Sequence, residues 1–222
     1  MKCKLITTAS NYDKTEILRQ SLDKFNWDYH IITHYWQGFG DKILKTYYYL
    51  KENPDITHFF YSDSYDTIAL DTMENTLAKI PNKDIILLSA ERACYPHPEK
   101  EEFYPKHDSP FHFVNGGGWF CNSQMFIELV EKDKPEQETV DQVWFTDQFL
   151  KGFCFIKLDY LCDVFQTIAF CPETDFSEMT KNTGDNFNEY QNKYILNNIT
   201  GSFPTFIHGN GHTPMDRFNK LI

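Results

Sequence analysis

The sequence predicts a single α/β domain, residues 1–222, built on a mostly parallel, doubly wound β-sheet. Short apolar stretches alternate with amphipathic ones along residues 1–90, which predicts an alternating order of strands and helices. Strands joined through helices are usually parallel neighbours in one sheet. The 222 residues suffice for one well-buried core, and an aromatic content of 17% argues against disorder.

The first half divides into strands and helices in turn. Strands are predicted at residues 3–8, 29–34, 58–62 and 85–89, with helices between them at 15–25, 41–51 and 71–79. The first helix carries Ile17, Leu18, Leu22 and Phe25 at helical spacing. The strand at 58–62 is almost entirely apolar, as expected of a strand buried on both faces.

The second half is less regular. Residues 91–112 hold four prolines and predict a long loop over the sheet edge, and long ordered loops are often functional. A strand ending at Asn115 leads into three glycines, which we interpret as a turn. Helices are predicted at residues 123–131 and 140–150, and strands at 153–158, 164–170 and 203–207. The polar residues 173–198 carry no clear pattern.

Charge and cysteine content narrow the class of function. The net charge of −11 argues against a broad basic surface that would bind nucleic-acid phosphates. Six cysteines form no Cys-x-x-Cys pair, so neither a zinc ribbon nor a redox motif is indicated. No apolar run reaches the roughly 20 residues of a membrane span. The N-terminus does not resemble a secretory signal, so a cytoplasmic protein without a membrane partner is expected.

Two aspartates follow directly on the buried strand at 58–62. Asp63 and Asp66 lie three residues apart in the sequence YSDSYD, at residues 61–66. Ligands of open α/β sheets bind beyond the carboxyl ends of the strands, where both acids could bind one divalent cation. A cation there would stabilise the charge of a departing diphosphate. The alternative is that both acids cap the following turn or helix.

A histidine and a glycine-rich segment end the last strand. His208 is followed by Gly209, Asn210 and Gly211, so its ring and nearby backbone N–H groups could face an anion. A structural or surface histidine is the alternative. If His208 joins the two aspartates as a ligand, Mn²⁺ is favoured over Mg²⁺, which prefers oxygen ligands.

Two further motifs carry polar side chains. Asn115 before the three glycines offers a donor and an acceptor to a sugar, although a tight turn or bulge would explain the same residues. Asp147 beside Gln148 is either a catalytic carboxylate or a solvated helix residue.

Together these motifs resemble one known family. Its members are the glycosyltransferase domain of the multifunctional procollagen lysyl hydroxylases and the related procollagen galactosyltransferases. The motifs appear in the family's order along nearly the whole chain: YSDSYD at 61–66, SAERACYP at 89–96, NGGG at 115–118, DQF at 147–149, LD at 158–159 with FQ at 165–166, and HGNG at 208–211.

The resemblance implies a GT-A-type, Rossmann-like fold, Mn²⁺, and a UDP-sugar donor such as UDP-glucose or UDP-galactose. It implies Asp63, Asp66 and His208 as metal ligands and Asn115, Asp147 and Gln148 as the catalytic group. The donor-binding residues that it implies are Thr7, Thr8, Lys42, Asp63, Ser64, Tyr95, Gly116, Gly117, Asn210 and Gly211.

The sequence departs from the family in two places. Thr146 stands where the family often continues a run of aspartates, and Pro214 replaces a lysine after the HGNG motif, with Arg217 as a candidate substitute. The sequence leaves open whether the acceptor hydroxyl belongs to a protein, a glycan or a hydroxymethylated DNA base. A catalytically silent nucleotide-sugar binding module and a metal-dependent phosphohydrolase are the alternative functions.

Overall fold

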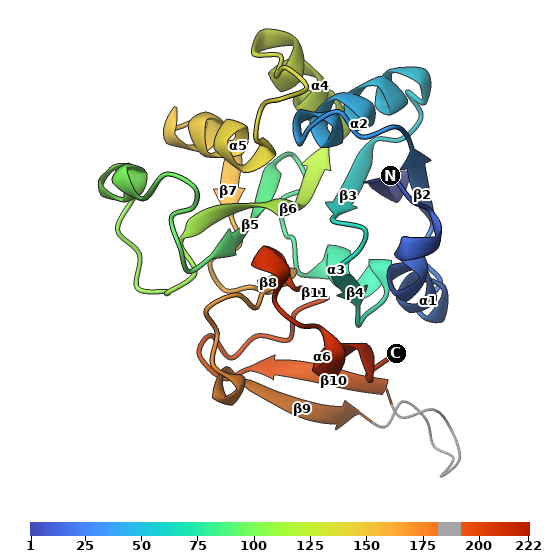
Figure 1. The fold of residues 1–222 in the computed structure, drawn as a ribbon, viewed down its shortest axis with the longest axis vertical. Coiled ribbons are helices and arrows are strands. Elements are labelled where there is room, and N and C mark those ends of the chain that lie inside the picture. Colours follow the sequence, from blue (N-terminus) through green and yellow to red (C-terminus); the bar gives the residue numbers. More distant parts are fainter. Residues whose placement is uncertain (182–191) are drawn as a thin grey trace.

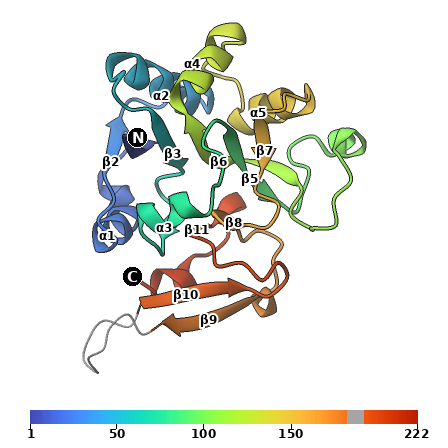
Figure 2. The same ribbon diagram turned by 180° about the vertical axis from the view of Figure 1, so that it is seen from behind.

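The structure is a computed structural model that describes residues 1–181 and 192–222. Part of the unassigned polar stretch 173–198 therefore lies outside the described residues. Figure 1 shows α2 and α4 at one end of the molecule and the small sheet β9–β10 with α6 at the other, and Figure 2 shows the same arrangement from behind. Among the described residues, no helix is both long and apolar enough to cross a membrane.

A nine-stranded mixed sheet forms the centre of the molecule, in the order β2-β1-β3-β6-β5-β8-β11-β4, with β7 also paired to β5. Most neighbours are parallel, but β6 runs antiparallel to β3 and β5, and β4 runs antiparallel to β11. The strands are β1 (Cys3–Ala9), β2 (Tyr29–Thr33), β3 (His58–Ser62), β4 (Thr67–Ala69), β5 (Ile86–Glu91), β6 (Phe113–Asn122), β7 (Ile156–Leu158), β8 (Phe165–Thr167) and β11 (Phe206–His208). A separate antiparallel pair is formed by β9 (Phe176–Lys181) and β10 (Asn192–Asn197).

The helices pack around this sheet. The α-helices are α1 (Glu16–Lys24), α2 (Gly40–Glu52), α3 (Met73–Ala78), α4 (Ser123–Lys132), α5 (Asp141–Leu150) and α6 (Asp216–Asn219). Short 3₁₀ turns are η1 (Asp13–Thr15), η2 (Pro98–Phe103), η3 (Glu173–Asp175) and η4 (Asn210–His212). Side-chain caps fix two helix starts: Asn122 accepts from Gln124 N and Met125 N at α4, and Thr72 accepts from Asn75 N at α3.

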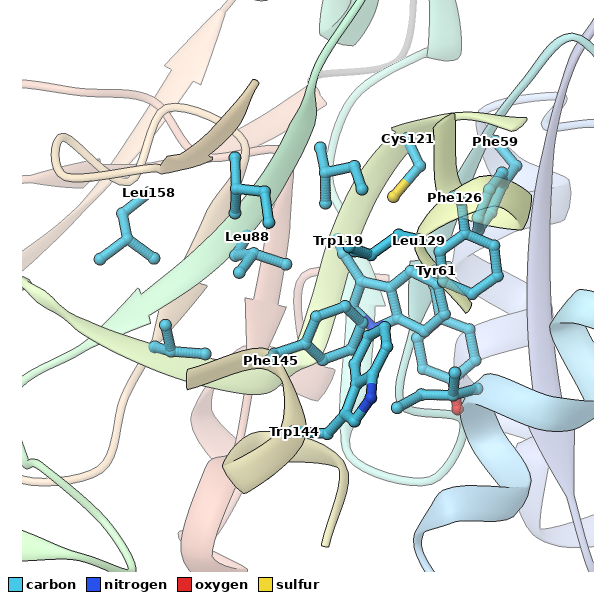
Figure 3. Packing of buried hydrophobic residues seen from close by; sticks show 14 of the residues in the cluster. Phe59, Tyr61, Leu88, Trp119, Cys121, Phe126, Leu129, Trp144, Phe145 and Leu158 are labelled. Atoms are coloured by element: carbon cyan, nitrogen blue, oxygen red, sulfur yellow. The ribbon is translucent and has the colours of Figure 1, made fainter. Parts of the chain in front are cut away.

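Aromatic side chains fill the core between the sheet and helices α4 and α5 (Figure 3). Trp119 of β6 stacks on Tyr61 of β3, with ring centroids 4.3 Å apart, and Phe126 of α4 and Phe145 of α5 pack against the same indole. All four side chains are fully buried. Burying such large apolar surfaces is the main stabilising contribution of the fold, and it holds the carboxyl end of β3 rigidly.

One expectation from the sequence is corrected by the structure, one is given more detail, and one strand was not predicted. The glycines 116–118 do not form a turn, because they lie inside the ten-residue strand β6. The pairing of β6 with β5 shifts register at this point, between Leu88 and Ser89 of β5. The predicted loop 91–112 contains the 3₁₀ turn η2 and projects from the sheet beside β5 (Figure 1). Strand β4 was not predicted, since three residues are too short to show alternation.

Candidate active site

The pairing of β4 with β11 brings two aspartates and a histidine together. Thr67, the first residue of β4, is the register partner of His208, the last residue of β11. Asp66 therefore lies beside His208, and Asp63 directly follows the end of β3. His208 Nε2 is 3.5 Å from Asp63 Oδ2 and 3.5 Å from Asp66 Oδ1. One ligand atom from each of the three residues lies within 4.8 Å of the others.

Backbone hydrogen bonds fix the turn that carries the two aspartates. Asp63 N donates to Gly117 O of β6 at 2.8 Å, and Gly209 N donates to Asp66 O at 2.8 Å. Ser64 Oγ donates to Thr8 O at 2.8 Å, and Thr7 Oγ1 donates to Ser62 O at 2.6 Å. Polar groups of Thr7, Thr8 and Ser64, three of the predicted donor-binding residues, thus form hydrogen bonds within the protein that hold β1 against this turn.

The His208 imidazole occupies the place that a side chain at Gly117 would take. A Cβ atom at this position would lie 2.1 Å from His208 Cε1 and 2.8 Å from Asp63 Oδ2. The His208 side chain is buried, and its Nδ1 has no hydrogen-bond partner among the described residues. The absence of a side chain at Gly117 therefore permits the close approach of β6 to the acid–histidine group.

Lys42 of α2 joins this group to a third carboxylate. Its Nζ lies 2.6 Å from Asp63 Oδ1 and 2.9 Å from Oδ2 of Asp141, the first residue of α5. The start of α2 is anchored by Gly40, whose N–H donates to Gln137 O at 3.0 Å and whose missing side chain admits Glu136 O. Lys42 is therefore a buried cation between two carboxylates at the base of the site.

The charges of the site shift one another's pKa values. Burial lowers the pKa of Lys42, but Asp141 and Asp63 outweigh it, so the net pKa is well above the usual range. Burial likewise opposes the protonation of His208, yet its contacts with Asp66 and Asp63 raise the pKa above 6.5. The pKa of Asp66 is lowered because His208 and Lys42 together exceed the effect of burial. Without a bound cation, the positive charges of His208 and Lys42 offset the negative charges of the carboxylates that they contact.

A buried glutamate forms the other half of the site. Glu91, the last residue of β5, accepts hydrogen bonds from Asn210 Nδ2 at 2.5 Å, Asn115 Nδ2 at 3.3 Å and the side-chain amide of Gln142. Burial raises the pKa of Glu91 to about 7, although these three amides favour its ionised form. A carboxyl that titrates near neutrality can exchange a proton with a reacting group.

The remaining predicted donor-binding residues surround Glu91. Asn115 Oδ1 also accepts from Gly117 N at 3.0 Å, and Gly116 N donates to Gln142 Oε1 at 3.3 Å. Asn210 Oδ1 accepts from Ile168 N and Ala169 N, and Gly211 has a φ of +65°, which glycine adopts without strain. Tyr95, 69% exposed, accepts from Gln142 Nε2 through its carbonyl oxygen.

Asp147 and Gln148 lie elsewhere. Asp147 is exposed and pairs with Lys100, and Gln148 Nε2 donates to Asp133 Oδ2 at 2.7 Å. The structure places Asp141 and Gln142 in the site in their stead. Asp147 is six residues further along α5, which is about 9 Å along the axis and on another face.

The sequence contains a signal for Asp141 and Gln142, although neither residue was predicted to lie in the site. The dipeptide Asp-Gln occurs at 141–142 as well as at 147–148, and only the first copy stands at the beginning of a helix. Glu91 was noted as the start of a loop and within the motif SAERACYP at 89–96, but no role in the site was predicted for it. Its place after a buried apolar strand is the same kind of signal that identified Asp63.

The fold is of the GT-A type, as in the solved glycosyltransferases described below. The chain belongs to the PLOD GT domain family, whose model matches residues 3–222. A solved glycosyltransferase involved in glycosylation of the major capsid of PBCV-1 superposes with a TM-score of 0.57 over 100% of both chains, at 8% identity. The galactosyltransferase LgtC, solved with donor and acceptor sugar analogs, gives a TM-score of 0.51 over 94% of this chain and 87% of its own, at 12% identity.

Similar sequences include longer proteins. An uncharacterized protein of Acanthamoeba polyphaga mimivirus is 28% identical over 177 residues, which are 78% of this chain and 36% of that protein. The multifunctional procollagen lysine hydroxylase and glycosyltransferase LH3 of Homo sapiens is 25% identical over 160 residues, 70% of this chain and 20% of LH3. The chain thus spans about a third or less of the length of these relatives.

Proposed function

We propose that this protein transfers a hexose from a UDP-sugar to an acceptor hydroxyl, with Mn²⁺ bound by Asp63, Asp66 and His208. The observation that carries the proposal is the convergence of these three side chains within 4.8 Å, although His208 is far from the two aspartates in sequence. The human relative LH3 is named as a glycosyltransferase, in agreement with the family assignment.

The three residues suit a divalent cation of this kind. Two carboxylates and one imidazole form a mixed oxygen and nitrogen set, which Mn²⁺ accepts more readily than Mg²⁺ does. His208 Nε2 faces both carboxylates at 3.5 Å, longer than a typical hydrogen bond, and the missing side chain of Gly117 leaves room for the imidazole in this position. When bound, the cation would neutralise charge on the diphosphate that leaves.

Lys42 and Tyr65 are the residues proposed to bind the two ends of the nucleotide. Lys42 Nζ lies beside Asp63 and can contact a diphosphate oxygen there. Tyr65 stands between the two aspartates, with its side chain 44% exposed and its hydroxyl bonded by Ser10 N at 2.8 Å and Asn11 N at 2.9 Å. A ring fixed in this way offers a face on which a base can stack.

Glu91 and Asp141 are the carboxylates proposed for the sugar. The amides of Asn115, Gln142 and Asn210 hold Glu91 in place, and Lys42 holds Asp141. In transfer, the acceptor oxygen bonds to the anomeric carbon while the bond from that carbon to the phosphate oxygen breaks. UDP departs with the electron pair, and Glu91, with a pKa of about 7, accepts the hydroxyl proton.

Binding and donor cleavage test this proposal directly. Thermal-shift measurements with UDP-glucose and UDP-galactose, each with Mn²⁺ and with EDTA, should show stabilisation only when the metal is present. Release of UDP should likewise stop on addition of EDTA and return with Mn²⁺. Donor cleavage that is insensitive to EDTA would refute the metal role.

The alternative functions give different products. Tight binding of UDP without turnover on water or any acceptor would indicate a silent binding module. Release of inorganic phosphate rather than UDP would indicate a phosphohydrolase. Salt-sensitive binding to DNA would favour a modified base as acceptor.

A further inference from the structure

A cavity of about 440 Å³ lies against α5, within the size range of small-molecule sites. Its walls come from α5, from the residue after it and from the connector between α4 and α5, residues 133–140. The side chains that the argument uses are Asp133, Val143, Trp144, Asp147, Gln148 and Lys151. The proposed metal ligands and Glu91 are not among its lining residues, so this α5 cavity is separate from the candidate active site.

One wall of the α5 cavity is a carboxylate that is fixed in place. Asp133 Oδ2 accepts from Gln148 Nε2 at 2.7 Å and from Lys151 Nζ at 2.5 Å. The backbone carbonyl of Asp133 accepts from Trp144 Nε1 at 2.9 Å, which ties the connector to α5. Lys151 and then Gln148 lower the pKa of Asp133 through these bonds. The carboxylate is therefore ionised and held in one orientation.

Hydrogen-bonding groups remain available around the α5 cavity. Both side-chain bonds to Asp133 end on Oδ2, and the bond from Lys100 to Asp147 ends on Oδ1. Asp133 Oδ1 and Asp147 Oδ2 thus accept no hydrogen bond from the residues that the structure describes. Gln148 uses one of its two amide N–H groups, and Lys151 uses two of its three. Such a mixture of acceptors and donors matches hydroxyl groups, which both donate and accept.

The charges around the α5 cavity cancel. Lys151 is paired with Asp133, and Lys100 is paired with Asp147. Neither lysine is free for a phosphate or carboxylate ligand, and the two acids repel an anion. A cationic ligand would have to displace one of the lysines. The charge balance therefore favours a neutral ligand that carries several hydroxyls.

The α5 cavity also has an apolar side. Val143 is half-buried and Trp144 is largely buried, and both line the cavity. The indole N–H of Trp144 is already bonded to the carbonyl of Asp133, so the ring offers only apolar atoms. The C–H groups of a sugar ring can pack on such a surface while its hydroxyls reach the polar wall.

We propose that the α5 cavity is a non-catalytic binding site for a neutral saccharide, either a free sugar or the end of a glycan. The inference goes beyond the proposed function, because binding there needs neither Mn²⁺ nor a nucleotide. It also gives a role to the second Asp-Gln pair of α5, Asp147 and Gln148, which the candidate active site does not use.

Saturation-transfer difference NMR in EDTA, without a nucleotide, tests this inference. The ligands are methyl β-glucopyranoside, methyl β-galactopyranoside and lactose, with glucuronate as a charged analogue. At least one neutral sugar should bind with a Kd of about 1 to 10 mM, as expected of a small ligand in an open polar site. Glucuronate should bind about tenfold more weakly, because Asp133 and Asp147 repel it. Tighter binding of lactose than of the methyl hexosides would indicate the end of a glycan, and equal or weaker binding a free sugar.

Two variants alter the α5 cavity by different routes. Asp133→Asn removes the charged acceptor, and Val143→Trp fills the space. Each should weaken binding of the neutral sugar at least about fivefold, and melting temperatures show that the variants are folded. Asp55→Asn is the matched control, because it also removes a carboxylate paired with a lysine, Lys2, and it should change nothing.

Several results would overturn the inference. They are a wild-type protein that binds no neutral sugar, binding that neither cavity variant weakens, and glucuronate binding as tight as that of the neutral sugars. Loss of binding in His208→Gln would place the sugar in the candidate active site and would also overturn it. A protein that binds sugars as expected but cleaves no UDP-sugar would instead overturn the proposed function alone.

Discussion

Two Asp-Gln pairs in one helix provide the sharpest test of individual residues. Asp141 is buried and paired with Lys42 beside Asp63, whereas Asp147 is exposed and paired with Lys100. We expect Asp141→Asn to lower UDP-sugar cleavage about a hundredfold, because it removes a charge beside the reacting sugar. Asp147→Asn should stay within about twofold, as expected of an exposed ion pair. Equal effects in steady-state kinetics would contradict the assignment of Asp141.

The affinity for Mn²⁺ should depend on pH through His208. Burial opposes a charge on this imidazole, but Asp66 and Asp63 outweigh it and raise its pKa. A cation can bind only the neutral ring, so binding must displace a proton when the pH is below that pKa. Below it, we expect affinity to rise up to about tenfold per pH unit.

Titration calorimetry in buffers of different ionisation enthalpy measures this proton release. The wild-type protein should release close to one proton per Mn²⁺ at pH 6 and fewer at pH 8. His208→Gln should bind Mn²⁺ more weakly and release none. An affinity that is the same at pH 6 and pH 8 would exclude His208 as a ligand.

Strand β6 shows how an element can serve a site without supplying a ligand. A Cβ atom at Gly117 would lie 2.1 Å from His208 Cε1, whereas at Gly152 it would meet nothing within 4 Å. We expect Gly117→Ala to weaken Mn²⁺ binding at least about tenfold, since the ring must move. Gly152→Ala, at a φ of +76°, should lower the melting temperature without changing Mn²⁺ affinity. Mn²⁺ affinity and melting temperature, measured for both variants, check this prediction.

The elements also show how far the sequence could predict the site. Strands with strong apolar patterns, such as β1 and β3, were predicted to within a residue at each end, and with them the position of Asp63. Strand β4 was missed because three residues cannot show alternation, yet its pairing is what places Asp66 beside His208. Asp141 was missed because the start of a helix alone does not show which element it packs against, and the pairing with Lys42 of α2 appears only in the tertiary structure. Local patterns thus singled out Asp63, Asp66 and His208, which the structure brings together, but not the contacts that depend on sheet order.

At the scale of the whole molecule, the net charge of −11 is partly concentrated in the site. Asp63, Asp66, Asp141 and Glu91 lie together, with Lys42 and His208 as their cations. Two groups show the cost of burying acids, because burial raises the pKa of Glu91 to about 7 and that of Asp159 to about 6. Protonation of the acids whose pKa is raised by burial, such as Glu91, stabilises the fold, whereas protonation of Asp66, whose pKa is lowered, does not.

The metal-free protein should therefore become less stable as the pH rises from 5 to 8. Glu91 in the folded chain holds its proton up to a pKa of about 7, against 4.5 when unfolded, so its ionisation opposes folding by about 3 kcal/mol at high pH. His208 acts in the same direction, since its raised pKa gives stability that is lost as the pH rises through the folded value. Asp66, with a lowered pKa, stays ionised across this range.

In EDTA, the melting temperature should fall steadily between pH 5 and pH 8. Glu91→Gln should flatten the slope of melting temperature against pH, whereas Glu74→Gln, at an exposed position, should not. A melting temperature that rises with pH in EDTA would show that these carboxylates are not held as the structure indicates.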